Sequence, residues 1–207
     1  VDQFFGIEIE EFPAQIAQVA MWLMDHQMNL LVAETFGENV VRLPLRKSAS
    51  IVNRNALRID WSDVVPAAEV DYIFGNPPFV GAKLMSPEQR EDLLVVAGDL
   101  KGAGLLDFVC AWYLKTAVFL GGNYSRESGT SRSTLHKVRC AFVSTNSIAQ
   151  GEQVAVLWGS LLSAGLRIRF AHRTFQWNNE ARGVAAVHCV IIGFGEEDDA
   201  PRLLFDY

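Results

Sequence analysis

An amide, two prolines and an aromatic ring follow one another at positions 76–79, where the sequence from residue 71 reads DYIFGNPPF. Two successive prolines donate no backbone hydrogen bonds to a sheet, so the apolar run before them must end here as a strand. The prolines stiffen the turn and hold the Asn76 amide and the Pro77 carbonyl at fixed positions. Two fixed acceptors suit an exocyclic amino group, and Phe79 offers a face on which a planar ring can stack. The stretch predicts a site for a planar amine.

An Asn-Pro pair alone is typical of an ordinary turn. The apolar strand before Asn76, and the second proline and the aromatic after it, favour the functional interpretation. Ligands of open α/β sheets bind beyond the carboxyl ends of the strands, which is where Asn76 is expected.

A carboxylate is expected near the end of another strand, residues 4–9, which read FFGIEI. Glu8 lies between Ile7 and Ile9, where an idle charge is costly. An acid in this position of a nucleotide-binding α/β fold accepts hydrogen bonds from ribose hydroxyls. The alternative is a solvated charge at a strand end.

Strands and helices alternate along the chain, which predicts an α/β fold with a mostly parallel sheet. Strands are expected at 4–9, 50–57, 70–75, 140–144, 167–175 and 185–194, with one more in the tail from 201. Helices are expected from 10 to about 36, after the Ser86 cap, at 104–120 and at 151–164. Residues 40–45 are compatible with an extended piece, and 121–137 form a Ser/Gly-rich loop. No helix separates the last two strands, so an antiparallel hairpin is expected.

The composition suits one domain with a sizeable core, since 50% of the 207 residues are hydrophobic and 20% are charged. The net charge of −6 argues against a surface that binds nucleic acid everywhere, so DNA binding needs a local cleft or another part of a longer protein. With neither a run of about 18 apolar residues nor a signal peptide, we expect no membrane span and a cytoplasmic protein. The cysteines and histidines show no metal-ligand spacing, so no metal is expected, and buried reduced thiols are.

The stretch D-x-x-x-x-N-P-P-F resembles the catalytic motif of the amino-methyltransferases, which grips the amino group of an adenine flipped out of the duplex. Four segments extend the resemblance over nearly the whole chain: FFGIEIEEFPAQIAQVAMWLMDHQMNL, NPPFVGAKLMSPEQR, FVSTNSIAQGEQVAVLW and AHRTFQWNNEARGVAAVHCVIIGF. In this order they resemble the N6-adenine DNA methyltransferase part of MmeI-like single-chain restriction–modification enzymes. NPPF alone also occurs in protein glutamine methyltransferases.

The resemblance implies a Rossmann-like methyltransferase sheet, S-adenosyl-L-methionine as cofactor, and double-stranded DNA as the partner of the parent enzyme. It implies catalytic roles for Asn76, Pro77, Pro78 and Phe79, and cofactor binding by Glu8, Ile9, Asn55 and Ala56. Phe175 and Trp177, expected in the turn between the last two strands, would join Phe79 in stacking on the base.

One position departs from the family. Asn55 stands where an Asp usually reads the adenine amino group of the cofactor; its oxygen can still accept, but its NH2 must avoid that group. Asp60 is a second candidate acid nearby, equally compatible with a solvated carboxylate at a turn.

Two parts of the family have no counterpart in residues 1–207, which are therefore interpreted as a partial methyltransferase domain. They are a glycine-rich cofactor motif before FFGIEI and a target-recognition domain after the last strand. We expect the chain alone to bind the cofactor weakly or not at all and to be inactive as an isolated fragment. In the related fold the missing strand lies between those ending at Glu8 and at Asn76. We expect these two strands to pair directly with each other. The alternatives are that a segment of the tail, or a second copy of the chain, takes the place of the missing strand.

Three functions remain open. The first is a DNA N6-adenine methyltransferase. The second is a protein glutamine methyltransferase, whose substrate also presents a planar primary amide. The third is a scaffold that keeps the fold without cofactor or catalysis.

Overall fold

The computed structural model describes residues 2–37, 49–121, 138–177, 187–196 and 201–206. They fall into two compact units, Val1–Pro66 and Ala67–Tyr207, and each unit is described by itself. The extended piece expected at 40–45 and nearly all of the Ser/Gly-rich loop expected at 121–137 lie outside the described residues.

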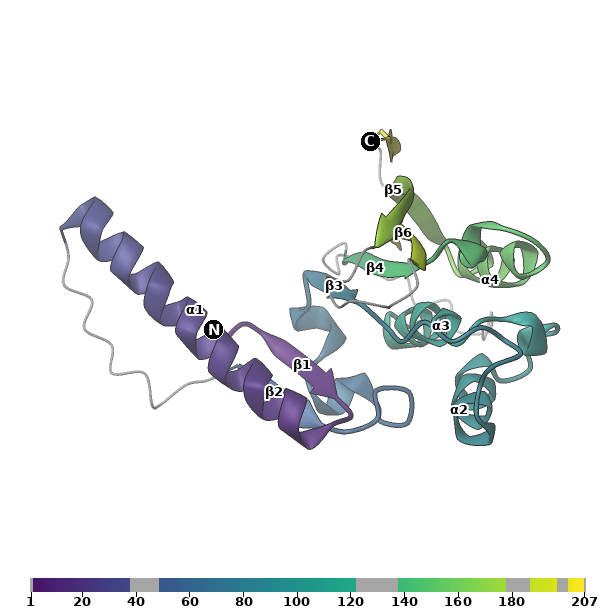
Figure 1. Cartoon of the computed structure of the whole chain (residues 1–207), viewed down its shortest axis with the longest axis horizontal. Coiled ribbons are helices and arrows are strands. Elements are labelled where there is room, and N and C mark those ends of the chain that lie inside the picture. The colour runs from purple at the N-terminus through teal and green to yellow at the C-terminus, as the bar shows by residue number, and fades with distance from the viewer. Residues whose placement is uncertain (1, 38–48, 122–137, 178–186, 197–200, 207) are drawn as a thin grey trace. The chain divides into compact units, whose positions relative to one another are not determined.

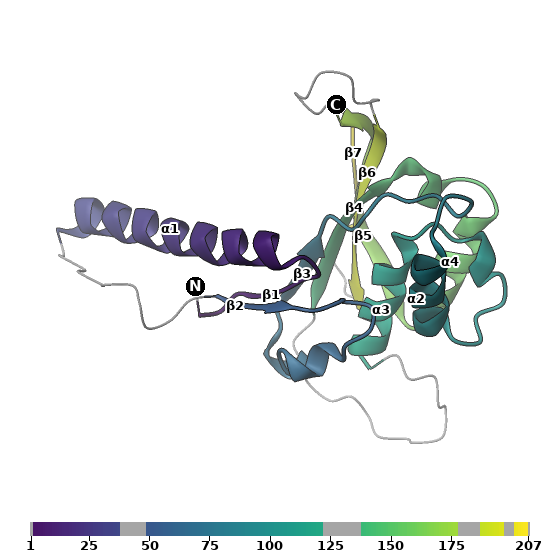
Figure 2. The same ribbon diagram turned by 60° about the horizontal axis from the view of Figure 1, so that its bottom comes forward.

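The first unit is a two-stranded parallel sheet with one long helix. Strand β1 (Phe5–Glu8) pairs with β2 (Ser50–Asn53), and Glu8 lies opposite Asn53. Helix α1 (Glu11–Phe36) packs along both strands, as Figures 1 and 2 show. It ends at Gly37, whose φ of 68° forms a left-handed C-terminal cap. The predicted helix is confirmed, whereas β2 is shorter than predicted because the chain turns after Asn53.

The second unit contains a five-stranded mixed sheet in the order β3-β4-β6-β5-β7. Strands β3 and β4 are parallel, β6 is antiparallel to both of its neighbours, and β7 is parallel to β5. The α/β class, the antiparallel hairpin and the short tail strand are thereby confirmed. The strands are β3 (Tyr72–Gly75), β4 (Arg139–Thr145), β5 (Leu166–Trp177), β6 (Val187–Glu196) and β7 (Leu203–Phe205).

Three helices lie on one side of this sheet in both views (Figures 1 and 2). They are α2 (Pro87–Ala97), α3 (Cys110–Phe119) and α4 (Gln153–Ser163), accompanied by 3-10 turns at η2 (Ala67–Glu69), η3 (Ala103–Leu105) and η4 (Asn146–Ala149). The predicted Ser86 cap is confirmed: Ser86 and Gln89 form a capping box at the start of α2. The helix predicted at 104–120 begins only at Cys110, because η3 and a turn at Asp107 precede it.

An aromatic cluster joins α3 to the sheet. The ring of the fully buried Tyr113 stacks on Phe194 with centroids 5.1 Å apart, and it meets Phe142 and Trp158 edge to face at 5.1 and 5.6 Å. Its hydroxyl shares a hydrogen bond of 2.8 Å with Ser144. The core of the second unit therefore lies between α3, α4 and the middle of β4 and β6.

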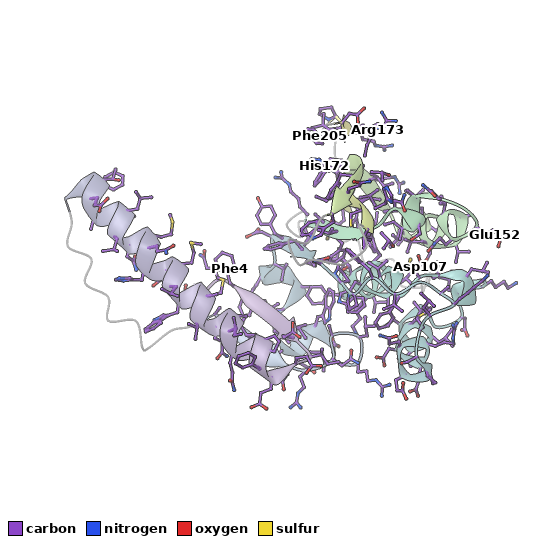
Figure 3. All side chains as sticks on the ribbon, in the orientation of Figure 1. Phe4, Asp107, Glu152, His172, Arg173 and Phe205 are labelled. Carbon is purple, nitrogen blue, oxygen red and sulfur yellow. The ribbon has the colours of Figure 1, made fainter. Side chains whose placement is uncertain are left out.

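The tail strand β7 is held to the outer edge of β5 by side chains labelled in Figure 3. His172 stacks on Phe205 with ring centroids 4.7 Å apart, and Arg173 pairs with Asp206 at 2.6 Å. This pair is exposed, so the stacked rings and the ladder contribute most of the attachment.

The two strands expected to pair directly do not pair. The partner of β1 is β2, while β3 lies at the edge of the five-stranded sheet beside β4. The tail strand does not fill a gap beside β1 either, because it pairs with β5. The prediction is wrong for a physical reason: each strand finds a parallel partner within its own unit, which satisfies one row of its backbone groups.

Three cysteine thiols are buried in the second unit: Cys110 and Cys189 at 0% exposure and Cys140 at 2%. Burial raises the pKa of Cys140 to about 12. The pKa of Cys110 is also raised, first by burial and then by the charge of Asp107. Burial also raises the pKa of Cys189. All three thiols stay protonated in the folded chain at neutral pH.

We expect the chain to lose stability as the pH rises above about 9. In the unfolded chain a thiol ionises at about pH 8.5. Above that pH the unfolded state binds fewer protons than the folded state. The free energy of unfolding therefore falls by up to about 1.4 kcal/mol per pH unit for each buried thiol. Denaturant unfolding at pH 7, 8.5 and 10 measures the slope. Cys140→Ala should make the slope shallower by one thiol, and an unchanged slope in that variant would contradict the assignment.

Candidate functional site

The segment Asn76–Phe79, called here the elbow, follows directly on the carboxyl end of β3. Asn76 and Pro78 are exposed, Pro77 is buried and Phe79 is half-buried. The Asn76 side chain makes no hydrogen bond to any other residue in the described part of the chain. Its amide is therefore available to a ligand, while the next residue, Pro77, is buried in the protein.

Both ends of the elbow are fixed. Before it, β3 pairs with β4, with Gly75 opposite Phe142. After it, the carbonyl oxygen of Val80 accepts a hydrogen bond of 2.9 Å from the N–H of Phe108, and the N–H of Ala82 donates to Asp107 Oδ1 at 2.8 Å. Arg90 also donates to the Ala82 carbonyl oxygen. These contacts hold the elbow without using the Asn76 side chain.

The residues predicted to bind the cofactor lie together in the first unit. Because β1 and β2 are parallel and Glu8 lies opposite Asn53, the carboxyl ends of both strands meet at one edge of the small sheet. Glu8 ends β1 and Ile9 follows it, while Asn55 and Ala56 come shortly after β2. Glu8 is half-buried, and its Oε1 accepts the N–H of Glu10 at 3.0 Å. A carboxylate has further lone pairs for hydroxyl donors.

Asn53 has a positioning role at this edge that the sequence did not suggest. Its Nδ2 donates to the carbonyl oxygens of Glu8 at 3.1 Å and of Ile9 at 2.8 Å. The N–H of Arg54 also donates to the Glu8 carbonyl oxygen, at 2.9 Å. The backbone that carries the Glu8 carboxylate is therefore tied to the end of β2.

Asn55 and Asp60 both make local hydrogen bonds. Asn55 Oδ1 accepts the N–H of Leu57 at 2.9 Å, so the predicted contact with the cofactor adenine must use the second lone pair of this oxygen. Asp60 caps the 3-10 turn η1 (Trp61–Asp63) by accepting the N–H of Ser62 at 2.9 Å. That cap favours a structural role for Asp60.

Phe175 and Trp177 are strand residues and do not lie in a turn, which corrects the expectation. The β5 ladder continues to Trp177, because β6 supplies partners as far as Val187. The two rings lie with centroids 6.3 Å apart. Phe175 pairs with Cys189, which pairs with Thr145 at the carboxyl end of β4. Both aromatic residues therefore lie at the same edge of the sheet as the elbow.

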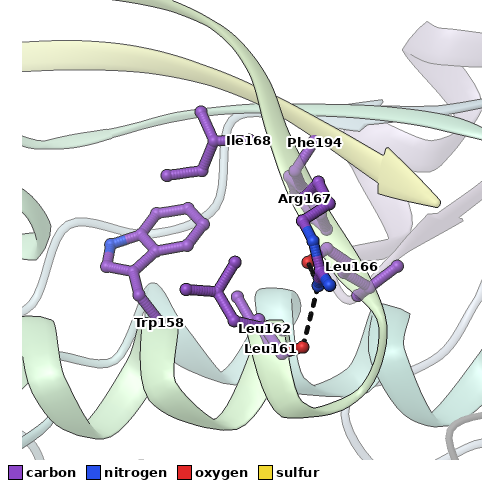
Figure 4. A pocket seen from close by; sticks show the side chains of 7 residues that line it. All are labelled: Trp158, Leu161, Leu162, Leu166, Arg167, Ile168 and Phe194. Carbon is purple, nitrogen blue, oxygen red and sulfur yellow. Dashed lines mark hydrogen bonds between the residues drawn. The ribbon is translucent and has the colours of Figure 1, made fainter. Parts of the chain in front are cut away.

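An apolar depression between α4 and β5 is part of the helix–sheet packing. Figure 4 shows its lining, and Arg167 Nη1 donates to the carbonyl oxygens of Leu162 and Leu166, both at 2.9 Å. It has no room for a water-sized molecule, so it does not suit a cofactor. Within the described ranges, no cluster of three His, Cys, Asp or Glu side chains could hold a metal ion. No described helix combines the length and the apolar character that crossing a membrane requires.

Comparisons with known proteins agree over nearly the whole chain. A family model described as MmeI, DNA-methyltransferase domain, matches residues 1–206. DNA methyltransferase A of Bacillus subtilis strain 168 is 40% identical over 202 residues, which are 96% of this chain and 21% of that protein. The Type IIL restriction–modification enzyme MmeI, solved in complex with DNA, is 56% identical with a TM-score of 0.87 over 100% of this chain and 26% of its own.

A more distant structure shares the fold alone. The modification subunit of a putative type I restriction enzyme from Vibrio vulnificus YJ016 is 16% identical, with a TM-score of 0.52 over 98% of this chain and 34% of its own. The chain thus spans only a minor part of the length of each protein that it matches.

Proposed function

The chain belongs to the family of MmeI-like DNA-methyltransferase domains, and on that premise we propose that it is part of an enzyme that methylates the N6 amino group of adenine in double-stranded DNA. The observation that carries this proposal is the elbow. It presents the exposed Asn76 amide on a turn that is fixed at both ends. Adenine has the planar ring and the exocyclic amino group that such a turn fits.

The elbow acts by placement and electrostatics. Asn76 Oδ1 and the Pro77 carbonyl oxygen accept the two hydrogens of the amino group and orient its lone pair. As the nitrogen becomes tetrahedral, the same oxygens would stabilise its positive charge until one proton leaves to solvent. The bond that the nitrogen forms to the methyl carbon would be balanced by the break of the carbon–sulfur bond in the methyl donor, whose sulfur would leave as a neutral thioether. Phe79 stacks on one face of the flipped-out base, and Phe175 or Trp177 on the other.

The first unit fits S-adenosylmethionine as cofactor. When bound, this cofactor supplies an electrophilic methyl group on a sulfonium centre. The Glu8 carboxylate would accept hydrogen bonds from the ribose hydroxyls, and Ile9, Asn55 and Ala56 would hold the rest of the nucleoside. Asn53 holds the backbone of this edge in place.

Transfer of the methyl group to the adenine nitrogen without a covalent enzyme intermediate agrees with the burial and the protonation of the three cysteines. Cys110, Cys140 and Cys189 are all buried, and burial raises the pKa of each thiol. Each therefore lacks the thiolate character that a covalent enzyme intermediate would need. The parent enzyme is proposed to belong to a restriction–modification system and to act in the cytoplasm.

The test uses the full-length parent enzyme with labelled S-adenosylmethionine. Genomic DNA from a methylation-deficient host is one substrate, and a glutamine-containing peptide is the other. We expect label in N6-methyladenine after nucleoside digestion, at sites that sequencing of the modified DNA then locates. Label on the peptide glutamine would support the protein methyltransferase instead, label on cytosine would contradict the base assignment, and no label on either substrate would favour a non-catalytic scaffold.

A further inference from the structure

A buried carboxylate close to the elbow takes no part in the chemistry described above. Asp107 lies between η3 and α3 and is 9% exposed; Figure 3 labels it. No cation among the described residues pairs with it. Burying a charged carboxylate is unfavourable unless hydrogen bonds compensate. The neutral donors around Asp107 must therefore offset the cost of burying its side chain.

Those donors come from three separate segments. Asp107 Oδ1 accepts the N–H of Ala82 at 2.8 Å. Oδ2 accepts the hydroxyl of Ser147 and the Nε2 of Gln153, the latter at 3.2 Å. Ala82 lies three residues after the elbow, Ser147 follows β4, and Gln153 begins α4. The Asp107 side chain thus joins the segment that follows the elbow to the end of β4 and the start of α4.

Neighbouring groups reinforce this junction. The N–H of Asp107 donates to Gln153 Oε1 at 3.2 Å, so the Gln153 amide contacts both the backbone and the side chain of Asp107. The Ser147 hydroxyl also shares a hydrogen bond of 2.7 Å with Thr145. Phe108 holds the Val80 carbonyl oxygen at 2.9 Å. Two consecutive residues before α3 therefore hold both residues that flank Gly81.

We propose that Asp107 is a positioning residue for methyl transfer: its carboxylate fixes the carboxyl-terminal side of the elbow against β4 and α4, so that Asn76 and Pro77 keep their places against the amino group. The inference rests on the proposed function. A displacement of about 1 Å at a reacting centre lowers a rate by about a hundredfold. Only a carboxylate accepts at both oxygens; an asparagine would turn an NH2 toward one set of donors.

The decisive variant is Asp107→Asn in the full-length enzyme, because it keeps the shape of the side chain. Single-turnover methylation is measured at saturating cofactor and saturating DNA that contains the enzyme's own site. We expect the rate constant to fall tenfold to a hundredfold, with the Kd values for DNA and cofactor changing less than about threefold. Backbone amides of residues 80–84 should exchange hydrogen faster than in the wild type, while those of β4 and β6 keep their protection.

Two further variants complete the design. Asp92→Asn is the matched control, because Asp92 is also a buried carboxylate, 6% exposed, but lies in the middle of α2. Its methylation rate should stay within about twofold of the wild type. Ser147→Ala removes one donor and leaves the carboxylate in place, so its rate should fall about threefold to tenfold. If Asp107→Asn does not fold, Ser147→Ala and its amide exchange decide the question.

Three outcomes would overturn the proposal. One is an Asp107→Asn rate within twofold of the wild type. Another is a loss of rate matched by weaker binding of DNA and cofactor and by lost protection throughout the second unit, which would show a purely structural role. The third is an equal loss in Asp92→Asn. If the wild-type enzyme methylates no DNA, the proposed function fails. Amide hydrogen exchange at residues 80–84 in Asp107→Asn then still tests whether Asp107 holds the elbow: faster exchange supports that role, and unchanged exchange contradicts it.

Discussion

Replacing Asn76 by alanine in the full-length enzyme is expected to lower the rate of DNA methylation by about a thousandfold, with the fold intact. Removal of one preorganised group that stabilises developing charge typically costs a hundredfold to a thousandfold, and here the same group also orients the nucleophile. Because Asn76 is exposed and binds no described residue, the free energy of unfolding should change by less than about 0.5 kcal/mol. Initial methylation rates and thermal unfolding measure the two effects.

Asn29→Ala provides the control for this experiment. Asn29 also presents an amide, but among the described residues it donates to Asp25, one turn earlier in α1. Its methylation rate should equal that of the wild type. A wild-type methylation rate in Asn76→Ala, or an equal loss of methylation rate in both variants, would contradict the assignment of the elbow as the catalytic motif.

Glu8→Gln is expected to weaken S-adenosylmethionine binding to the full-length enzyme by about tenfold to a hundredfold. Hydrogen bonds to a charged acceptor are worth about 1.5–3 kcal/mol, and the amide removes the charge and one of the two acceptor oxygens. The remaining oxygen can still accept the N–H of Glu10, so the local turn is kept. Calorimetric titration with the cofactor gives the affinity directly.

The matched control is Glu11→Gln, in the first turn of α1. The Glu11 side chain is exposed and accepts from Gln15 at 3.4 Å within the same helix. Its cofactor affinity should match that of the wild type. An unchanged affinity in Glu8→Gln would remove Glu8 from the cofactor site and leave it as a strand-end charge.

Local signals in the sequence were sufficient for several elements. The α1 helix was predictable because apolar residues recur at helical spacing before Gly37, and α2 because Ser86 and Pro87 form a standard start. The end of β3 was predictable because two prolines follow it. Each of these features depends on residues a few positions apart, whose chemistry decides the local backbone.

The pairing of β1 and the junction at Asp107 depend instead on contacts between distant segments. Nothing next to Glu8 indicates that Ser50–Asn53 supplies its partner strand, and a sheet can satisfy one edge of β1 in several ways. Asp107 is separated from Ala82 by 25 residues and from Gln153 by 46. One signal could have drawn attention to it: an isolated carboxylate within the apolar run LLDFVCAW is costly unless the fold provides donors.

The same separation explains how the candidate site was predicted only in part. Asn76 and Glu8 are candidates from the sequence because Asn76 follows a strand and Glu8 ends one, and strand ends can be predicted from local sequence. Asn53 was missed because its role is to bind the backbone of another strand. The sequence predicts a turn at Phe175 and Trp177, because the length of the β5 ladder depends on how far β6 continues opposite them.

The contacts that hold the segment after the elbow differ in whether they use main-chain or side-chain atoms. Val80 and Ala82 contribute main-chain atoms, whereas Asp107 contributes its carboxylate. Other side chains that fit the space can therefore replace Val80 and Ala82 without loss of these contacts. The exception is proline at position 82, which has no N–H. Position 107 has no such freedom. Purifying selection should thus be concentrated on a residue distant in sequence from the motif it serves, and spare the neighbours of that motif.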